Sequence, residues 1–232
     1  MLIFSFETWQ ITLFSLVVGL ASTIVILPFG IALAWLFARR EWPLKSAVET
    51  IVLLPLVIPP VSTGLILLKI FGRRSLVGEW LYDRGIEIVF NWKGVLIAMA
   101  VMSFPLLVRA ARISFSEVNP RLEQIAATLG ASPLKIFFVI TIPLALRGII
   151  AGALLAFARA LGEFGATILL AGNIPGKTQT LSLAIFNFVQ LGKDREAYTL
   201  LAITVILGFS SVWCSEWLLK SRKPIEPPRD AG

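Results

Sequence analysis

Long stretches of the sequence carry no charged side chain, and this feature constrains the fold more than any other. There is none between Glu7 and Arg39, and none between Glu49 and Lys69. A helix that crosses a bilayer needs about 20 consecutive apolar residues, so each of these stretches is long enough to span. The backbone groups of a spanning segment must be satisfied without water, which a helix does within itself. The sequence therefore predicts an all-α integral membrane protein.

The composition excludes most alternatives to a membrane protein. Hydrophobic residues make up 57% and charged residues 15% of the chain, against about 45–50% and about 25% in a soluble domain, so a water-soluble enzyme is excluded. With no histidine and a single cysteine, Cys214, the chain has no set of metal ligands, no disulfide and no imidazole base. We expect no metal and no cofactor. The net charge of +7 is interpreted as membrane topology, and no nucleic-acid partner is expected.

The distribution of basic residues predicts the orientation of the chain. The first ten residues carry no Lys or Arg, whereas Arg39, Arg40 and Lys45 follow the first span and Lys220 begins a basic tail. Since Lys and Arg concentrate on the cytoplasmic side, the N-terminus is predicted outside and the C-terminus in the cytoplasm. This requires an odd number of spans, and the apolar region 136–176 holds one or two. We predict about five spans, at 11–38, 50–71, 94–112, 143–163 and 197–217.

Three prolines interrupt the second predicted span, at Pro55, Pro59 and Pro60. Proline removes a backbone donor and disrupts a helix. At membrane depth this is tolerated where the backbone lines a pathway or packs on other protein. Proline is also simply commoner in membrane helices than in soluble ones, so both interpretations stay open. Pro59 and Pro60 are candidates for a translocation pathway.

Residues 116–135 predict a short helix outside the membrane. Asn119 is a good N-cap, Pro120 suits the first helical position, and Gly130 can adopt the left-handed conformation that ends a helix. Pro133 follows and is expected to stop it. A helix of about ten residues is marginal in water, so it must dock, either on the chain's own membrane helices or in a groove of a partner. Its apolar face comprises Leu122, Ile125, Ala126 and Leu129.

The sequence of this loop, LEQIAATLGASPLKIFFVITIPL, resembles the cytoplasmic loop of binding-protein-dependent ABC importer permeases. That loop reads Glu-Ala-Ala, three residues, Gly, nine residues, Ile-x-Leu-Pro. The spacing from Gly130 to Ile140 is kept, while Gln124 occupies the slot of the glutamate, Ile125 that of the first alanine and Ile142 that of the leucine. The resemblance implies that the loop docks on a cytoplasmic ATPase, with either Glu123 or Gln124 making the polar contact. The coupling residues it implies are Glu123, Gln124, Ala126, Gly130 and Pro143.

Further segments are similar to the sulfate/molybdate subgroup of these permeases, and the short chain is most similar to molybdate permeases. These segments are ARALGEFGAT at 158–167, GNIPGKT at 172–178, GRR at 72–74 with GE at 78–79, and MSFP at 102–105. The resemblance implies a type I ABC importer permease fold over residues 1–220, with a disordered cytoplasmic tail at 221–232.

The resemblance also implies a function and a set of partners. The chain would be a multi-pass subunit of the cytoplasmic (inner) membrane that moves molybdate, or alternatively sulfate, thiosulfate or tungstate. It would itself be no enzyme, because a partner chain hydrolyses ATP. The implied partners are a second copy of the chain, two cytoplasmic ABC ATPase subunits, an extracytoplasmic molybdate-binding protein and the lipid bilayer.

Two further motifs bear on mechanism. Residues 171–178 nearly spell a phosphate-binding loop, but Ala171 stands where its first glycine is required, so nucleotide binding is rejected. Arg159 and Glu163, four apart on a predicted helix, share a face and can pair. We favour a structural ion pair, and keep both residues as pathway candidates because Arg159, or Arg147, would suit a passing oxyanion.

Two other function classes are weighed against a transport subunit driven by a separate ATPase. A self-contained secondary transporter is expected to show paired halves with matching broken helices, and none is visible. An integral-membrane enzyme would need an acid–base constellation, which the sequence does not display.

Overall fold

The computed structural model describes residues 5–220, and every regular element in that range is a helix. An all-α fold is therefore confirmed. The tail at 221–232, predicted to be disordered, lies outside the described residues. The helices are α1 (Phe6–Arg39), α2 (Lys45–Val57), α3 (Pro60–Phe71), α4 (Leu76–Tyr82), α5 (Trp92–Glu117), α6 (Pro120–Thr128), α7 (Pro133–Ile136), the π-helix η1 (Phe137–Thr141), α8 (Ile142–Leu161), α9 (Gly165–Leu170), α10 (Leu181–Gln190) and α11 (Asp194–Lys220).

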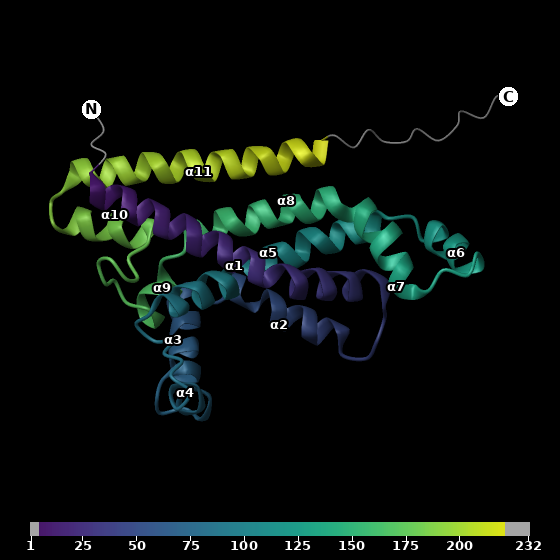
Figure 1. Ribbon diagram of the computed structural model, residues 1–232, viewed down its shortest axis with the longest axis horizontal. Coiled ribbons are helices and arrows are strands. Elements are labelled where there is room, and N and C mark those ends of the chain that lie inside the picture. The colour runs from purple at the N-terminus through teal and green to yellow at the C-terminus, as the bar shows by residue number, and fades with distance from the viewer. Residues whose placement is uncertain (1–4, 221–232) are drawn as a thin grey trace.

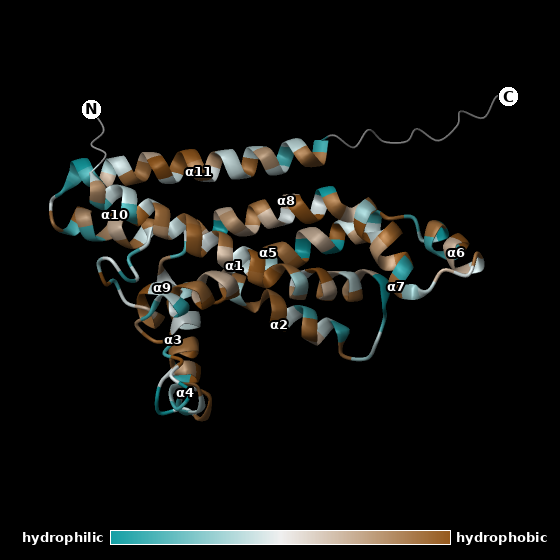
Figure 2. Ribbon diagram, viewed as in Figure 1, coloured by the Kyte–Doolittle hydropathy of each residue, from teal (hydrophilic) through white to brown (hydrophobic). Residues whose placement is uncertain are grey.

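Four helices in the described range are long and apolar enough to cross a membrane: α1, α5, the continuous unit Pro133–Leu161, and α11. The pair α2 and α3 adds a fifth if it counts as one broken span. Hydrophobic residues follow the length of these helices (Figure 2). Each of the four is longer than the span predicted for it; α5, for example, runs to Glu117, beyond the predicted end at 112.

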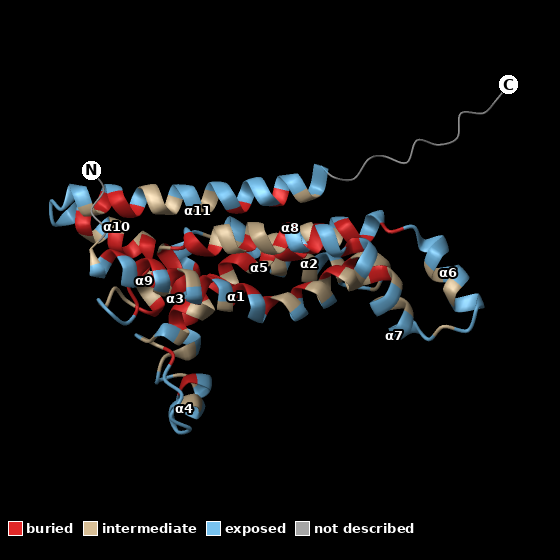
Figure 3. Ribbon diagram, turned by 45° about the horizontal axis from the view of Figure 1, so that its top comes forward, coloured by how far each residue is buried: buried red, intermediate tan, exposed pale blue. Residues whose placement is uncertain are grey.

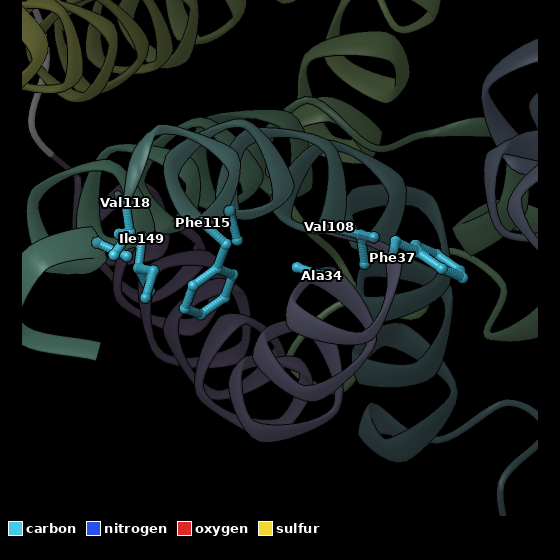
Figure 4. Packing of buried hydrophobic residues seen from close by; sticks show 8 residues of the cluster. Ala34, Phe37, Val108, Phe115, Val118 and Ile149 are labelled. Atoms are coloured by element: carbon cyan, nitrogen blue, oxygen red, sulfur yellow. The ribbon is translucent and has the colours of Figure 1, made fainter. Parts of the chain in front are cut away.

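The centre of the bundle is α5, which packs against α1 on one side and α8 on the other (Figure 1). One apolar cluster joins the three helices, with Phe37 from α1, Phe115 from α5 and Ile149 from α8 (Figure 4). Small residues let α5 and α8 approach closely: a Cβ on Gly152 would lie 2.8 Å from that of Ala110. Close packing of this kind matters in membranes because lipid tails are as apolar as the side chains. The hydrophobic effect then does little to hold two helices together, and van der Waals contacts do more.

Two hydroxyl groups tie the outer helices to this centre. The Ser215 hydroxyl of α11 donates to the Ala151 carbonyl of α8 at 3.0 Å. At the start of α10, the Leu181 N–H donates to the Ser15 hydroxyl of α1 at 2.8 Å. Both serines are fully buried, where such bonds satisfy groups that water does not reach.

The predicted break in the second span is confirmed, and the structure adds its size. The chain bends by 113° between α2 and α3, so the predicted span at 50–71 is not one straight helix. Pro59 and Pro60 stand at the break, whereas Pro55 lies inside α2. Beyond the bend, α3 leaves the bundle and carries α4 at its tip (Figure 1).

The region 136–176, for which one or two spans were predicted, holds one long helix and one short one. The long unit runs from Pro133 to Leu161 through η1. The chain breaks at Gly162 and then forms the six-residue α9. The helix that holds the predicted span at 143–163 therefore begins earlier, at Pro133, because the apolar residues before Pro143 continue the same helix.

Candidate functional site

Helix α6 has the ends that the sequence predicted. The Asn119 side chain accepts from the Arg121 N–H at 3.0 Å, and Pro120 occupies the first turn. Gly130 is left-handed with φ +83°. The Gly130 N–H donates to Ala127 O and the Ala131 N–H to Ala126 O, both at 3.0 Å. These two bonds form a Schellman motif, which satisfies the last carbonyls of the helix.

The structure adds one detail to the predicted loop. Pro133 follows the end of α6, as expected, and it also begins α7, with Ser132 as N-cap. Because proline lacks the N–H that the first helical turn leaves unpaired, it starts a helix as readily as it follows one. The long unit that ends at Leu161 therefore starts ten residues before Pro143, which lies exposed on its side.

The apolar face of α6 does not pack on the chain's own membrane helices. Leu122 is 44%, Ile125 57% and Leu129 83% exposed, and Ala126 is half-buried. The helix lies at the end of the bundle away from the start of α1, with its surface largely uncovered (Figures 1 and 3). Packing of this apolar face on the chain's own membrane helices is therefore not observed in the described residues. Docking in a groove of a partner stays a prediction.

The carboxylate of Glu123 binds other residues of the same chain. One carboxylate oxygen, Oε1, accepts from Nη2 of Arg39 at 3.1 Å and from the Thr141 hydroxyl at 2.7 Å. The same guanidinium nitrogen donates to Val118 O at 2.8 Å. The exposed fractions of the Arg39 and Glu123 side chains are 12% and 22%, so the pair is partly shielded from water. We call Arg39, Glu123 and Thr141 the α6 anchor.

The neighbouring Gln124 has a different environment. Its side chain is exposed and makes no hydrogen bond to another described residue. Glu123 and Gln124 were the two residues considered for a polar contact with the ATPase. Glu123 is hydrogen-bonded to α1 and η1, and Gln124 is exposed to solvent. Sequence reasoning missed Arg39 and Thr141, because they lie far from Glu123 along the chain and carry no motif.

The second group of predicted site residues lies at the break between α8 and α9. Arg159 Nη1 and Glu163 Oε2 are 2.8 Å apart, which confirms the predicted pair. Glu163 is 1% exposed, and its other oxygen accepts from the Ala166 N–H at 2.8 Å. A buried carboxylate needs such partners. The pair thus neutralises its own charge and fixes the start of α9.

The two chain breaks meet in space. A Cβ on Gly165 would lie 2.8 Å from the Cβ of Pro60, and one on Gly64 would lie 2.7 Å from the Cα of Ala166. The α2–α3 break and the α8–α9 break therefore pack directly on one another, while Pro59 beside them stays exposed. The structure brings Pro60 near the segment held by Glu163, and leaves α6 at the opposite end of the bundle (Figure 1).

Residues 171–178, the near match to a phosphate-binding loop, form hydrogen bonds with one another. The Thr178 hydroxyl donates to Gly172 O at 3.2 Å and accepts from the Ile174 N–H at 3.0 Å. In a true phosphate-binding loop this hydroxyl and the backbone N–H groups serve the nucleotide. Here they hold the turn.

Comparison with known proteins identifies the family. Residues 26–221 match the family described as binding-protein-dependent transport system inner membrane component. The molybdenum transport system permease protein ModB of Escherichia coli K12 is 48% identical over 91% of this chain and 93% of its own length. A putative molybdenum permease of Bacillus subtilis, YvgM, is 40% identical over 83% and 85%. The sulfate permease CysT of Escherichia coli K12 is 36% identical over 78% and 67%.

Solved structures show the same fold at low sequence identity. A bacterial alginate ABC transporter, solved in complex with an alginate-bound periplasmic protein, has a chain that matches with a TM-score of 0.68 at 18% identity, over 92% of this chain and 77% of that one. An inward-facing MetNI methionine ABC transporter matches with 0.65 at 18% identity, over 94% and 98%. With the fold and the family match in agreement, this chain belongs to the inner membrane components of binding-protein-dependent transport systems.

Proposed function

We propose that this chain is the membrane-spanning permease subunit of an ABC importer that carries molybdate into the cytoplasm. The observation that supports this most is the 48% identity to a molybdenum permease, which extends over nearly the whole of both chains. The more distant match to a sulfate permease, at 36%, keeps sulfate or thiosulfate as the alternative substrate. Tungstate, another tetrahedral dianion, is a further alternative.

The proposed assembly holds two copies of this chain, two cytoplasmic ATPase subunits and an extracytoplasmic molybdate-binding protein. The basic residues around the first span and in the tail favour a cytoplasmic α6 and an outside N-terminus. In this orientation α6, with its exposed apolar face, lies on the side where ATP is available. The break between α2 and α3 then lies nearer the side from which a binding protein delivers its ligand.

In this assembly α6 is the coupling helix. Some of its residues contact the ATPase, and Glu123 fixes the helix to the rest of the chain. Leu129 and Ile125, both more than half exposed, insert into the ATPase, and Gln124 makes the polar contact there. Glu123 makes no contact with the ATPase. Its role is to fix α6 to α1 and η1 through Arg39 and Thr141, so that a displacement of α6 is passed to the membrane helices.

For the pathway we propose that Pro59 and Pro60 shape a passage in which Arg159 and Glu163 are structural. The carboxylate of Glu163 cancels the charge of Arg159 at 2.8 Å, so this pair is a poor trap for a dianion. A conducting site must also bind weakly enough to release its ion. Discrimination between tetrahedral dianions needs a dry site with matched donors. We therefore assign selection to the binding protein.

The test is reconstitution of the chain with its ATPase in proteoliposomes, with ATP inside and the binding protein outside. We expect labelled molybdate to accumulate only when both are present. Accumulation without ATP would indicate a secondary transporter, and accumulation of sulfate but not molybdate would establish the alternative substrate.

A second arm tests where selection occurs. The native binding protein is replaced by a sulfate-binding protein that carries the native docking surface. ATP-driven sulfate entry supports a permissive pathway. Normal docking and hydrolysis without sulfate entry would mean that the permease selects, with Arg147 and Arg159 the first residues to mutate.

A further inference from the structure

A cavity of about 550 Å³ lies where the first three turns of α1 meet the loop before α10. This volume falls in the range of about 300–1,000 Å³ that is typical of small-molecule sites. The start of α1, which lines this cavity, lies at the opposite end of the bundle from α6 (Figure 1). Neither α6 nor the Arg159–Glu163 pair contributes to the wall of the cavity.

The polar part of this cavity has donors and acceptors without partners. Glu7 and Lys177 line it from the two sides, both are exposed, and neither joins an ion pair with another residue in the range 5–220. Gln179 is only 4% exposed, yet its side-chain amide makes no hydrogen bond to a described residue. Its amide atoms are not among the enclosed polar atoms that lack a partner, so the amide faces the open cavity, where it is free to bind a polar group.

The apolar part continues away from the polar groups along α1. Leu13 and Val17 line the cavity. With Leu20 and Ile24 they recur every three or four residues, which places them in one stripe on the helix. All four are about half exposed, at 47%, 57%, 54% and 55%. The stripe lies within a helix that is apolar enough to cross the membrane, so acyl chains can lie along it.

We infer that the cavity binds a phospholipid whose headgroup carries both a phosphate and a primary ammonium, as phosphatidylethanolamine does. Lys177 and the Gln179 amide donate to the phosphate, Glu7 accepts from the ammonium, and an acyl chain follows the α1 stripe. The exposed Trp9, at 57%, lies in the same turn as Glu7, where tryptophan marks the membrane interface.

The shape of the lining favours a lipid over other occupants. The occupant needs a charged end of both signs and a long apolar end that continues into the span. A water-soluble partner has no access to the α1 stripe at membrane depth. An apolar helix of a second copy would cover the stripe but leave Glu7, Lys177 and Gln179 without partners.

The test uses the permease–ATPase complex and native mass spectrometry to count bound lipids. The probes are phosphatidylethanolamine, phosphatidylglycerol and phosphatidylcholine with identical acyl chains. We expect the ethanolamine lipid to be retained about fivefold more than either, a ratio that corresponds to about 1 kcal/mol. Phosphatidylglycerol lacks the ammonium, and phosphatidylcholine lacks N–H donors for Glu7. Equal retention of the three lipids would overturn the proposal.

Variants test whether Glu7 and Lys177 cause the preference for the ethanolamine lipid. We expect Glu7→Gln with Lys177→Gln to reduce the ratio to about one, and Lys177→Arg to keep it. The matched control is Asp83→Asn with Lys93→Gln, which removes one charge of each sign from a different cavity and should keep the ratio. An unchanged ratio in the first double variant overturns the proposal. If that variant instead loses the second copy or the binding protein, the cavity is a protein interface.

Discussion

The α6 anchor predicts that Glu123 and Arg39 act as one unit. The two side chains are 3.1 Å apart and are 12% and 22% exposed. The contribution of the pair to stability therefore lies between that of an exposed ion pair and that of a buried hydrogen bond to a charged group. Exposed ion pairs contribute about 0–1 kcal/mol, and hydrogen bonds to charged groups about 1.5–3 kcal/mol. We expect Glu123→Gln to weaken the placement of α6 by about 1–2 kcal/mol, which is a factor of about 5–30.

The assay is uptake and ATP hydrolysis measured together in proteoliposomes. In the proposed coupling a displaced α6 would transmit the motion of the ATPase poorly, so molybdate imported per ATP should fall severalfold in Glu123→Gln and in Arg39→Gln. Thr141→Val, which removes one neutral donor at 2.7 Å, should cost less. Gln124→Ala should instead weaken the affinity for the ATPase.

A double-mutant cycle decides between an anchor and a direct contact. If Glu123 acts through Arg39, the double variant costs about as much as the more severe single variant, because each residue loses the same partner. If Glu123 contacts the ATPase itself, the two effects add. Additive losses would refute the anchor.

Three further predictions concern the loop, the packing and the topology. Gly130→Pro should abolish uptake while the protein still inserts, since proline is incompatible with φ +83° and removes a donor; full uptake would argue against α6 as the coupling element. Gly152→Ala should lower the unfolding midpoint by overpacking, which costs about 1–3 kcal/mol, because the new Cβ would lie 2.8 Å from a neighbouring methyl group. Gly208→Ala, with nothing within 4 Å, should leave that midpoint unchanged or raise it, and equal midpoints in the two variants would contradict this packing. In a Cys214→Ser background, Asp83→Cys should react with an impermeant maleimide from outside, and reaction only from within would refute the orientation.

Local signals in the sequence were enough to predict α6 and its ends. Asn119, Pro120 and Gly130 each act within a few residues through backbone conformation and donor count, so no tertiary information was needed. The same holds for Arg159 and Glu163, which a helical spacing of four places on one face. The membrane helices followed from charge-free stretches, although their ends extended beyond the hydrophobic stretches.

The features that the sequence did not predict depend on tertiary geometry. The bond from Arg39 to Glu123 joins residues 84 apart in the chain, and no periodicity relates them. Thr141 reaches Glu123 from the π-helix η1, whose extra residue per turn has no clear sequence signal. Pro59 and Pro60 predicted a break but not a bend of 113°, because proline removes a hydrogen bond without specifying where the chain then packs.

The most direct test of the proposed coupling is the accessibility of the exposed face of α6 in the assembled transporter. Leu129, at 83% exposed, is replaced by cysteine in a Cys214→Ser background, and its maleimide labelling rate is measured with and without the ATPase. We expect at least a tenfold slower rate in the complex, on the order of what a docked side chain with about 1.4 kcal/mol of protection shows. A cysteine at the exposed Ser116, which precedes α6, serves as the control and should label at similar rates. Equal rates at position 129 with and without the ATPase would contradict docking through α6.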